Sequence, residues 1–313
     1  MKRRWIYVGL AVTLGTVFAV GSLLILDTWV RSRFPLLNRH GYTGPVLGAK
    51  SQGEYRIAVL GGSTVLGYGM ASWREAFPAY LESDLQPHVR VANLGFNNQG
   101  TYSFAFTIRQ YAYLRPDLVV FYEGYNDLSG MNMIDFRQLS VLFRWTGYYP
   151  MLPIVAGEKA MLLRVGDLRA AYAGKTIVFT PSLAQRSEAS ILEMIKMLDR
   201  GGPTFKTTYT DGTAFYLANI RRAIEEAKQS HIAVMVVGQP RINARHSAQQ
   251  AALHTMLCAE YRDVPYVDVA LDLHDPALCW DGMHLTADGN RAVAAAIASA
   301  VKAYRSHGVQ PCH

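Results

Sequence analysis

The sequence of 313 residues contains only three cysteines: Cys258, Cys279 and Cys312. Three thiols are too few for a disulfide framework, although an oxidising compartment allows one pair to form. The cysteines and the histidines His246, His254 and His274 also lack the spacing of a metal site. The sequence therefore predicts no metal and no cofactor.

Charge is also scarce, since Asp, Glu, Lys and Arg make up 18% of the chain, with a net charge of +7. The first 33 residues carry +4 of this charge (five basic residues against Asp27), which leaves +3 for the rest. A basic face for nucleic acid is thus not indicated. The chain shows no internal repeat, no low-complexity tract and no second domain boundary, so we expect one sizeable domain.

One long apolar run is present. Residues 5–26 are uncharged and long enough to span a bilayer as a helix. The basic residues 2–4 favour a cytoplasmic amino terminus, whereas Arg31 and Arg33 on the far side weaken that bias. A cleaved signal peptide is the alternative, because residues 19–21 form a small-x-small site. The apolar run continues beyond that site, which favours an uncleaved anchor. In both cases we expect the folded part outside the cytoplasm, on the periplasmic side in a bacterium.

Apolar strand patterns alternate with helical patterns along the rest of the chain, which predicts an α/β fold with a parallel, doubly wound sheet. The predicted strands are residues 57–60, 88–92, 118–122, 231–237 and 265–269. The predicted helices are residues 73–85, 104–114, 190–198, 213–230, 247–261 and 288–304. We expect an anchor at 1–33, a connector at 34–55 and a main domain at 56–308.

The stretch from Arg56 to Gly69 organises the chain. A short buried strand ends in Gly61-Gly62-Ser63, which places a serine on a tight turn at the carboxyl edge of the sheet. Glycines there let a substrate approach the backbone. A loop that binds phosphate, or an ordinary strand–helix turn, is the alternative interpretation.

Two later stretches change that interpretation. Residues 121–127 end in Asn126-Asp127 after the third strand, and residues 280–289 place Asp281 and His284 before the last helix. Each alone fits a turn or a helix cap. Together, and in this order, the three stretches resemble blocks I, III and V of the SGNH (GDSL-type) hydrolases, over roughly residues 40–305. Gly62 departs from the family's Gly-Asp-Ser, as in a branch that includes alginate acetylation proteins.

The resemblance implies a three-layer, flavodoxin-like α/β/α sandwich with a five-stranded parallel sheet, together with a set of site residues. Ser63 would be the nucleophile, His284 its base and Asp281 the residue that orients the histidine. The oxyanion donors would be the Ser63 N–H, the Asn126 amide and a backbone N–H from the second block. That last donor is either Asn98, which tolerates a left-handed backbone, or Gly100. Asp127 would hold the Asn126 turn, and His246 with Asp272 is the fallback pair.

Residues 129–210 form an insertion that is rich in aromatic residues and methionine. We expect a lid, or a cap that binds an acceptor, over the serine. Core filling and a surface lying on the membrane are the alternatives.

Three functions remain open at this stage. The first is a serine esterase that hydrolyses O-acyl esters, with an acetyl or short acyl group on envelope carbohydrate as the expected substrate. The second is an O-acyltransferase for cell-surface polysaccharide, which would need an acyl donor from a multi-spanning membrane partner. The third is a catalytically silent carbohydrate-binding domain, against which the complete set of Ser63, Asn126, Asp281 and His284 argues.

Overall fold

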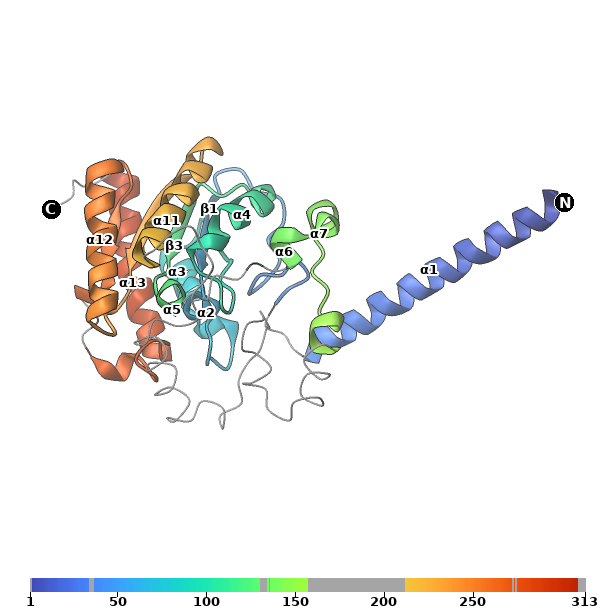
Figure 1. Cartoon of the computed structure of the whole chain (residues 1–313), viewed down its shortest axis with the longest axis horizontal. Helices are drawn as coiled ribbons and strands as arrows, with labels where there is room; N and C mark the ends of the chain where they lie inside the picture. Colours follow the sequence, from blue (N-terminus) through green and yellow to red (C-terminus); the bar gives the residue numbers. More distant parts are fainter. Residues whose placement is uncertain are drawn as a thin grey trace.

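The computed structural model describes residues 2–33, 37–129, 134, 136–156, 212–271, 273 and 275–308. A helix at the amino terminus, α1 (Lys2–Arg33), extends away from an α/β body that contains the rest of the described chain (Figure 1).

All five strands run parallel, in the order β2-β1-β3-β4-β5. They are β1 (Tyr55–Gly61), β2 (Val89–Asn93), β3 (Leu118–Tyr122), β4 (Ala233–Gly238) and β5 (Tyr266–Asp268). In the register of the sheet, Val59 of β1 lies opposite Asn93 of β2 and Val120 of β3. This is the flavodoxin-like strand order, so the predicted fold is confirmed.

Five of the six predicted helices are present, and four short helices were not predicted. They are α2 (Ser63–Leu66), α3 (Phe77–Leu85), α4 (Phe104–Gln110), α5 (Tyr125–Ser129), α6 (Phe136–Leu139), α7 (Val141–Thr146), α11 (Gly212–Gln229), α12 (Ala244–Glu260) and α13 (Ala287–His307). The helix predicted at 104–114 is shorter, because α4 gives way to a 3₁₀ turn at Ala112–Leu114 that ends on the left-handed Arg115 (φ 52°). The helix predicted at 190–198, and most of the proposed lid, lie outside the described residues.

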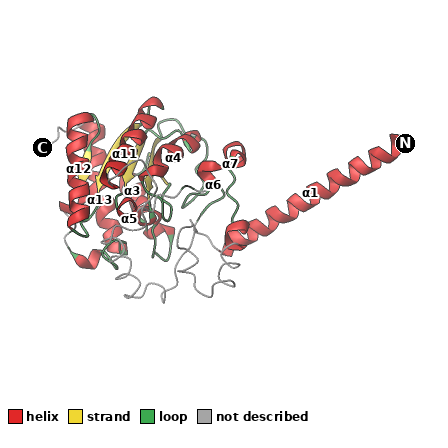
Figure 2. Ribbon diagram, viewed as in Figure 1, coloured by secondary structure: helices red, strands yellow, loops and turns green. Residues whose placement is uncertain are grey.

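Helices cover both faces of the sheet (Figure 2). Ile57 and Val59 of β1 belong to a buried cluster with side chains of α3 and α13, whereas Ala58 and Leu60 belong to a second cluster with α4, α11 and α12. Successive residues of a strand point to opposite faces. A strand that is apolar at every position is therefore buried on both sides, which produces the three layers.

The last helix is joined to α3 by a buried asparagine. Asn290, which is 1% exposed, accepts a hydrogen bond from the Phe77 amide (2.8 Å). Its side-chain amide donates to the carbonyls of Leu285 (3.3 Å) and Thr286 (2.9 Å). Asn290 therefore holds the start of α13, and the loop before it, against the start of α3.

The end of α1 is attached to the body. Asp27 is 3% exposed and accepts hydrogen bonds from the Tyr148 hydroxyl (2.5 Å), the Leu152 amide (2.6 Å) and Arg31 (3.0 Å). Arg31 also donates to the carbonyls of Asn38 (2.7 Å) and Tyr149. Of the described helices, α1 is the one long and apolar enough to cross a membrane, with a mean hydropathy of 2.2 over its most apolar window and none of that window buried.

Asn290→Ala removes one acceptor and two donors at once, and it leaves the buried Phe77 amide unsatisfied. We expect a loss of about 1–3 kcal/mol in the free energy of unfolding, measured by urea denaturation of the full chain in detergent. Asp288→Ala is the matched control, because Asp288 is an exposed partner of Arg291 at the start of the same helix. Equal stability of the two variants would contradict the assigned role of Asn290.

Candidate active site

The first site element is the turn after β1. β1 ends at Gly61, Gly62 precedes α2 with φ −86° and ψ −148°, and Ser63 is the first residue of α2. Because β1 lies between β2 and β3, the loops that follow these three strands meet at the same edge of the sheet. The sheet order therefore brings the turn of Ser63, the loop of Asn98 and the turn of Asn126 together.

The second element is the loop before α13, which brings the ring of His284 within hydrogen-bond distance of the Ser63 hydroxyl. Nε2 of His284 is 2.8 Å from Oγ of Ser63, and Nδ1 of His284 is 2.5 Å from Oδ2 of Asp281. Oδ1 of Asp281 accepts hydrogen bonds from the backbone amides of Met283 (2.9 Å) and His284 (2.5 Å). The carboxylate therefore stabilises the turn of its own loop. Asp281 and His284 are each 3% exposed.

The carboxyl of Asp281 is held in its ionised form. Burial alone would raise its pKa, but the neighbouring His284 and the hydrogen bonds from the ring and from two backbone amides outweigh burial, so the pKa lies below its ordinary value. An ionised carboxylate behind an imidazole fixes the proton on Nδ1 and leaves Nε2 to accept one from the serine.

Two aromatic rings that the sequence analysis did not single out pack around His284. Tyr68 lies with its centroid 4.6 Å from the imidazole, and Trp280 stacks on the imidazole at 5.3 Å with an interplanar angle of 18°. Trp280 needs the glycine at position 69 (φ 92°), because a Cβ there would lie 2.8 Å from the indole. The rings restrict His284 to one orientation. Gly69, close after the serine turn, was the available signal for this close packing.

The side chain of Asn126 lies beside the same turn. Its Nδ2 donates to the carbonyl of Gln99 (3.0 Å), in the loop after β2. Asp127 accepts from the amide (3.1 Å) and hydroxyl (2.7 Å) of Thr101, which ties the Asn126 turn to that loop. Asn126 thus stands between the loops that follow β1 and β2.

The two predicted backbone donors of the second block differ in conformation. Asn98 has φ 56°, the left-handed conformation that was expected of a donor at that position. Gly100 is extended, with φ −104° and ψ −165°. The assignment of the donor to Asn98 or to Gly100 stays a prediction, and the backbone favours Asn98.

One residue of the fallback pair, His246, lies within the described chain. Asp272 lies outside the described residues. His246 is fully buried, packs against Tyr125 at 4.7 Å and has no hydrogen-bond partner for its ring among the described residues. Burial, followed by the charge of Arg241, lowers the pKa of His246 to about 3. The histidine hydrogen-bonded to Ser63 is His284.

The cysteine nearest to the site is a free thiol. Cys279 is not bridged, whereas Cys258 is disulfide-bonded. Burial, followed by the charge of Asp281, raises the pKa of Cys279 to about 11. Cys279 therefore forms no bridge to stiffen the loop that carries Asp281 and His284, which is held by the hydrogen bonds of Asp281 and by the packing of Tyr68 and Trp280.

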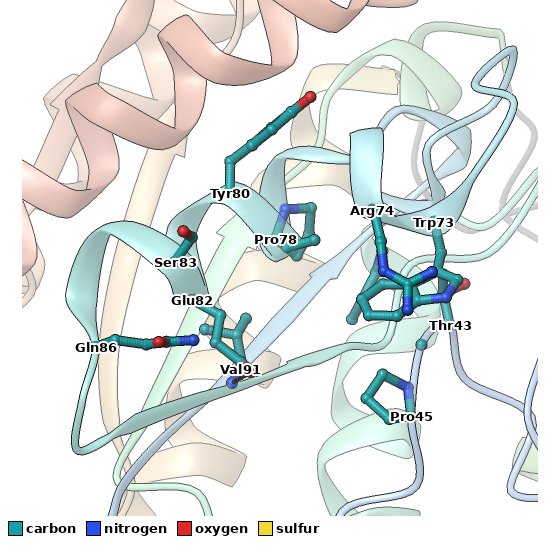
Figure 3. Close-up of a pocket in the computed structure, with 13 residues that line it drawn as sticks. Thr43, Pro45, Trp73, Arg74, Pro78, Tyr80, Glu82, Ser83, Gln86 and Val91 are labelled. Carbon is teal, nitrogen blue, oxygen red and sulfur yellow. Dashed lines mark hydrogen bonds between the residues drawn. The ribbon is translucent and has the colours of Figure 1, made fainter.

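A separate pocket of about 310 Å³ lies between α3, β2 and residues 43–45 (Figure 3). The guanidinium of Arg74 lies 4.7 Å from the centre of the Trp73 ring at its mouth. The pocket is lined by none of the predicted site residues, and we assign it no role.

The model of the GDSL-like lipase/acylhydrolase family matches residues 59–292, a range that includes Ser63, Asn126, Asp281 and His284. The chain belongs to this family. A comparison with curated proteins finds no match.

Solved structures of similar fold include a GDSL-like lipase from Bacteroides thetaiotaomicron, at 15% identity and a TM-score of 0.48, with 82% of this chain and 92% of that chain covered. A member of the G-D-S-L lipolytic family from Veillonella parvula is similar at 11% identity and a TM-score of 0.46, with coverage of 79% and 98%. A catalytic mutant of an acetylxylan esterase from Geobacillus stearothermophilus is similar at 14% identity and a TM-score of 0.43, with coverage of 82% and 95%.

Gly62 has no room for a side chain. A Cβ at this position would lie 2.0 Å from Nδ2 of Asn126 and 2.7 Å from Oε2 of Glu123. We expect Gly62→Ala to displace Asn126 and to lower kcat for a p-nitrophenyl ester by about 10²–10³, the cost of one lost oxyanion donor. Gly48→Ala is the control, because nothing lies within 4 Å of its added Cβ. Full activity of Gly62→Ala in the folded protein would contradict this placement of Asn126.

Proposed function

We propose that this GDSL-family chain is a serine esterase in which Ser63, His284 and Asp281 act as a catalytic triad. The observation that carries the proposal is the continuous hydrogen-bonded chain from Ser63 Oγ through His284 to Asp281, with separations of 2.8 Å and 2.5 Å. A serine hydroxyl becomes a useful nucleophile when a base within hydrogen-bond reach takes its proton during attack.

The chemistry then follows the acyl-transfer sequence. Oγ of Ser63 attacks the ester carbonyl while Nε2 of His284 accepts the hydroxyl proton, and Asp281 stabilises the imidazolium. The carbonyl oxygen becomes an oxyanion, for which the Ser63 N–H, the Asn98 or Gly100 N–H and the Asn126 amide are the proposed donors. His284 returns the proton to the leaving alcohol. Water, activated by the same histidine, then releases the acid from the acyl-serine.

We place an acetyl or short acyl ester of envelope carbohydrate first among the substrates, on the strength of the resemblance of the serine block to carbohydrate acetylation proteins. The same acyl-serine serves an O-acyltransferase if a sugar hydroxyl replaces water. Free acid as product would support the esterase, whereas ester on the sugar would support the transferase.

Attachment to a membrane through residues 5–26 is the second part of the proposal. It is supported by the exposed apolar surface of α1 and by the contacts of Asp27 and Arg31 with the body. The outward side of α7, just before Tyr148, carries Val141, Leu142 and Trp145, which are 56%, 63% and 83% exposed. Apolar side chains with a tryptophan are typical of surfaces at the membrane interface.

Ser63→Ala and His284→Ala should each lower kcat of the full chain in detergent by about 10⁴-fold or more toward p-nitrophenyl acetate, butyrate and octanoate. A fluorophosphonate should label the wild type and not Ser63→Ala. Thr255→Ala, which removes an exposed hydroxyl of α12, is the control and should match the wild type. Turnover that survives Ser63→Ala, with no labelling of Ser63 in the wild type, would reject both the esterase and the transferase.

Asp27→Ala should loosen the junction between α1 and the body, because it leaves the Leu152 amide and the Tyr148 hydroxyl without their acceptor. We expect cleavage near residue 33 to become at least about fivefold faster in limited proteolysis. This factor corresponds to a decrease of about 1 kcal/mol in the free energy of local opening. Thr28→Ala, at the adjacent exposed position, is the control. Identical cleavage rates would show that the junction does not depend on Asp27.

A further inference from the structure

The turn after β3 carries a buried carboxyl that the proposed mechanism does not use. Glu123 follows β3 directly and is 3% exposed. Its Oε1 accepts hydrogen bonds from the backbone amides of Gly124 (2.9 Å) and Asn126 (3.1 Å). The carboxyl therefore closes the turn that presents Asn126 to the site.

The other oxygen of this carboxyl faces the turn of the candidate nucleophile. Oε2 lies 3.5 Å from Nδ2 of Asn126, a long separation for a hydrogen bond, and 2.7 Å from the position of a Cβ on Gly62. The amide of Gly62 is a further donor to the same carboxyl. Glu123 follows β3, the strand next to β1. Its carboxyl fills the space into which a side chain at position 62 would project.

Within the described chain, Glu123 has no cationic partner, and the charge that acts on it is the like charge of Asp127. A buried carboxylate without a counter-ion favours its protonated form. Burial, followed by the charge of Asp127, raises the pKa of Glu123 to about 8, against the opposing effect of its backbone hydrogen bonds.

Other titratable groups lie around this turn, but burial and the charge of Asp127 have the larger effects on Glu123. They come from several elements: Arg137 of α6, Tyr216 of α11, His246 of α12, and the pair His284 and Asp281. Arg137 is committed to Gln99 Oε1 and to the carbonyls of Leu94 and Gly41. The Tyr216 hydroxyl donates to the main-chain carbonyl of Glu123, not to its carboxyl.

We propose that Glu123 is a positioning residue of the acyl-transfer site: a neutral carboxylic acid that orients Asn126 and fills the space which glycine leaves at position 62. The proposal rests on the proposed function. In its neutral form the acid holds the Asn126 turn without placing charge near the oxyanion. When it releases its proton to solvent, the carboxylate draws the Asn126 amide toward Oε2 and opposes negative charge on the substrate oxygen.

The test compares kcat of the wild type and Glu123→Gln between pH 5.5 and 9.5, with full-length protein in detergent and p-nitrophenyl acetate. Gln is a neutral isostere of the protonated acid. Wild-type kcat should fall above pH 8 and be lower by about tenfold at pH 9, because the group ionises near pH 8. Glu123→Gln should lie within about threefold of the wild type at pH 7 and keep its plateau at pH 9. Glu226→Gln, at a carboxylate that pairs with Arg109 elsewhere on the surface, should follow the wild type.

An alkaline decline that is the same in Glu123→Gln and in the wild type would overturn the proposal. Infrared difference spectra give a readout that does not depend on activity. The carbonyl stretch of a buried carboxylic acid should be present in the wild type at pH 7, lost by pH 9, and missing at both values in Glu123→Ala. Absence of that band from the wild type would also overturn the proposal, even if Glu123→Gln does not fold.

The spectra also separate this inference from the proposed function. If Ser63→Ala keeps full turnover while the carboxylic-acid band is present, the esterase mechanism fails and the neutral Glu123 stands. If turnover depends on Ser63 but Glu123→Gln leaves the pH profile unchanged, the role of Glu123 fails and the esterase stands.

Discussion

The hydrogen bond between Ser63 Oγ and His284 Nε2 joins two residues that are 221 positions apart in the sequence. It forms only if the turn after β1 and the loop before α13 are both fixed to within a few tenths of an ångström. β1 is fixed because it is a central strand with neighbours on both sides. The loop is fixed by Asp281 from inside, by the Trp280 and Tyr68 rings around the imidazole, and by Asn290, which holds α13 against α3.

Carboxyl groups at this edge of the sheet lie in different environments, which shift their pKa values in opposite directions. Asp281 is buried against a histidine and two amides that favour its anion. Glu123 is buried against amides and a second carboxylate, so its neutral form is favoured. A buried carboxyl with a cationic or ring N–H partner is favoured as the anion, and one without such a partner is favoured as the neutral acid. The electrostatic field at Ser63 therefore depends on these partners more than on the number of acidic residues in the loops.

The sequence was sufficient to predict the strands, the main helices and the contacts of the Ser63, Asp281 and His284 side chains. The strands are mostly apolar and α11 has a regular apolar face, so their patterns are local. The Asp-x-x-His pair is also local, because its geometry is completed within one loop. The roles of the site residues remain predictions that await the variants described above.

Other features could not be predicted, because they arise from the approach of distant segments. Glu123 is charged in isolation, and only its burial beside Gly62 and Asp127 changes its state. Two of the partners of Asp27, Tyr148 and Leu152, lie more than 120 positions away, and no periodicity predicts such a contact. Tyr68 and Trp280 are ordinary aromatic residues in the sequence, and they meet only when the loop before α13 folds over α2.

The attachment of Asp27 and Arg31 has a mechanical consequence. A domain on a flexible linker samples all orientations and reaches any ester within the length of its tether. Here the last turn of α1 is bonded to the body, so helix and body turn together. If α1 lies in a bilayer, the orientation of the body, and with it of Ser63, relative to the membrane normal is set by the tilt of one helix. Ser63 then reaches only esters that lie at one height above the lipid. A change in bilayer thickness would change that height.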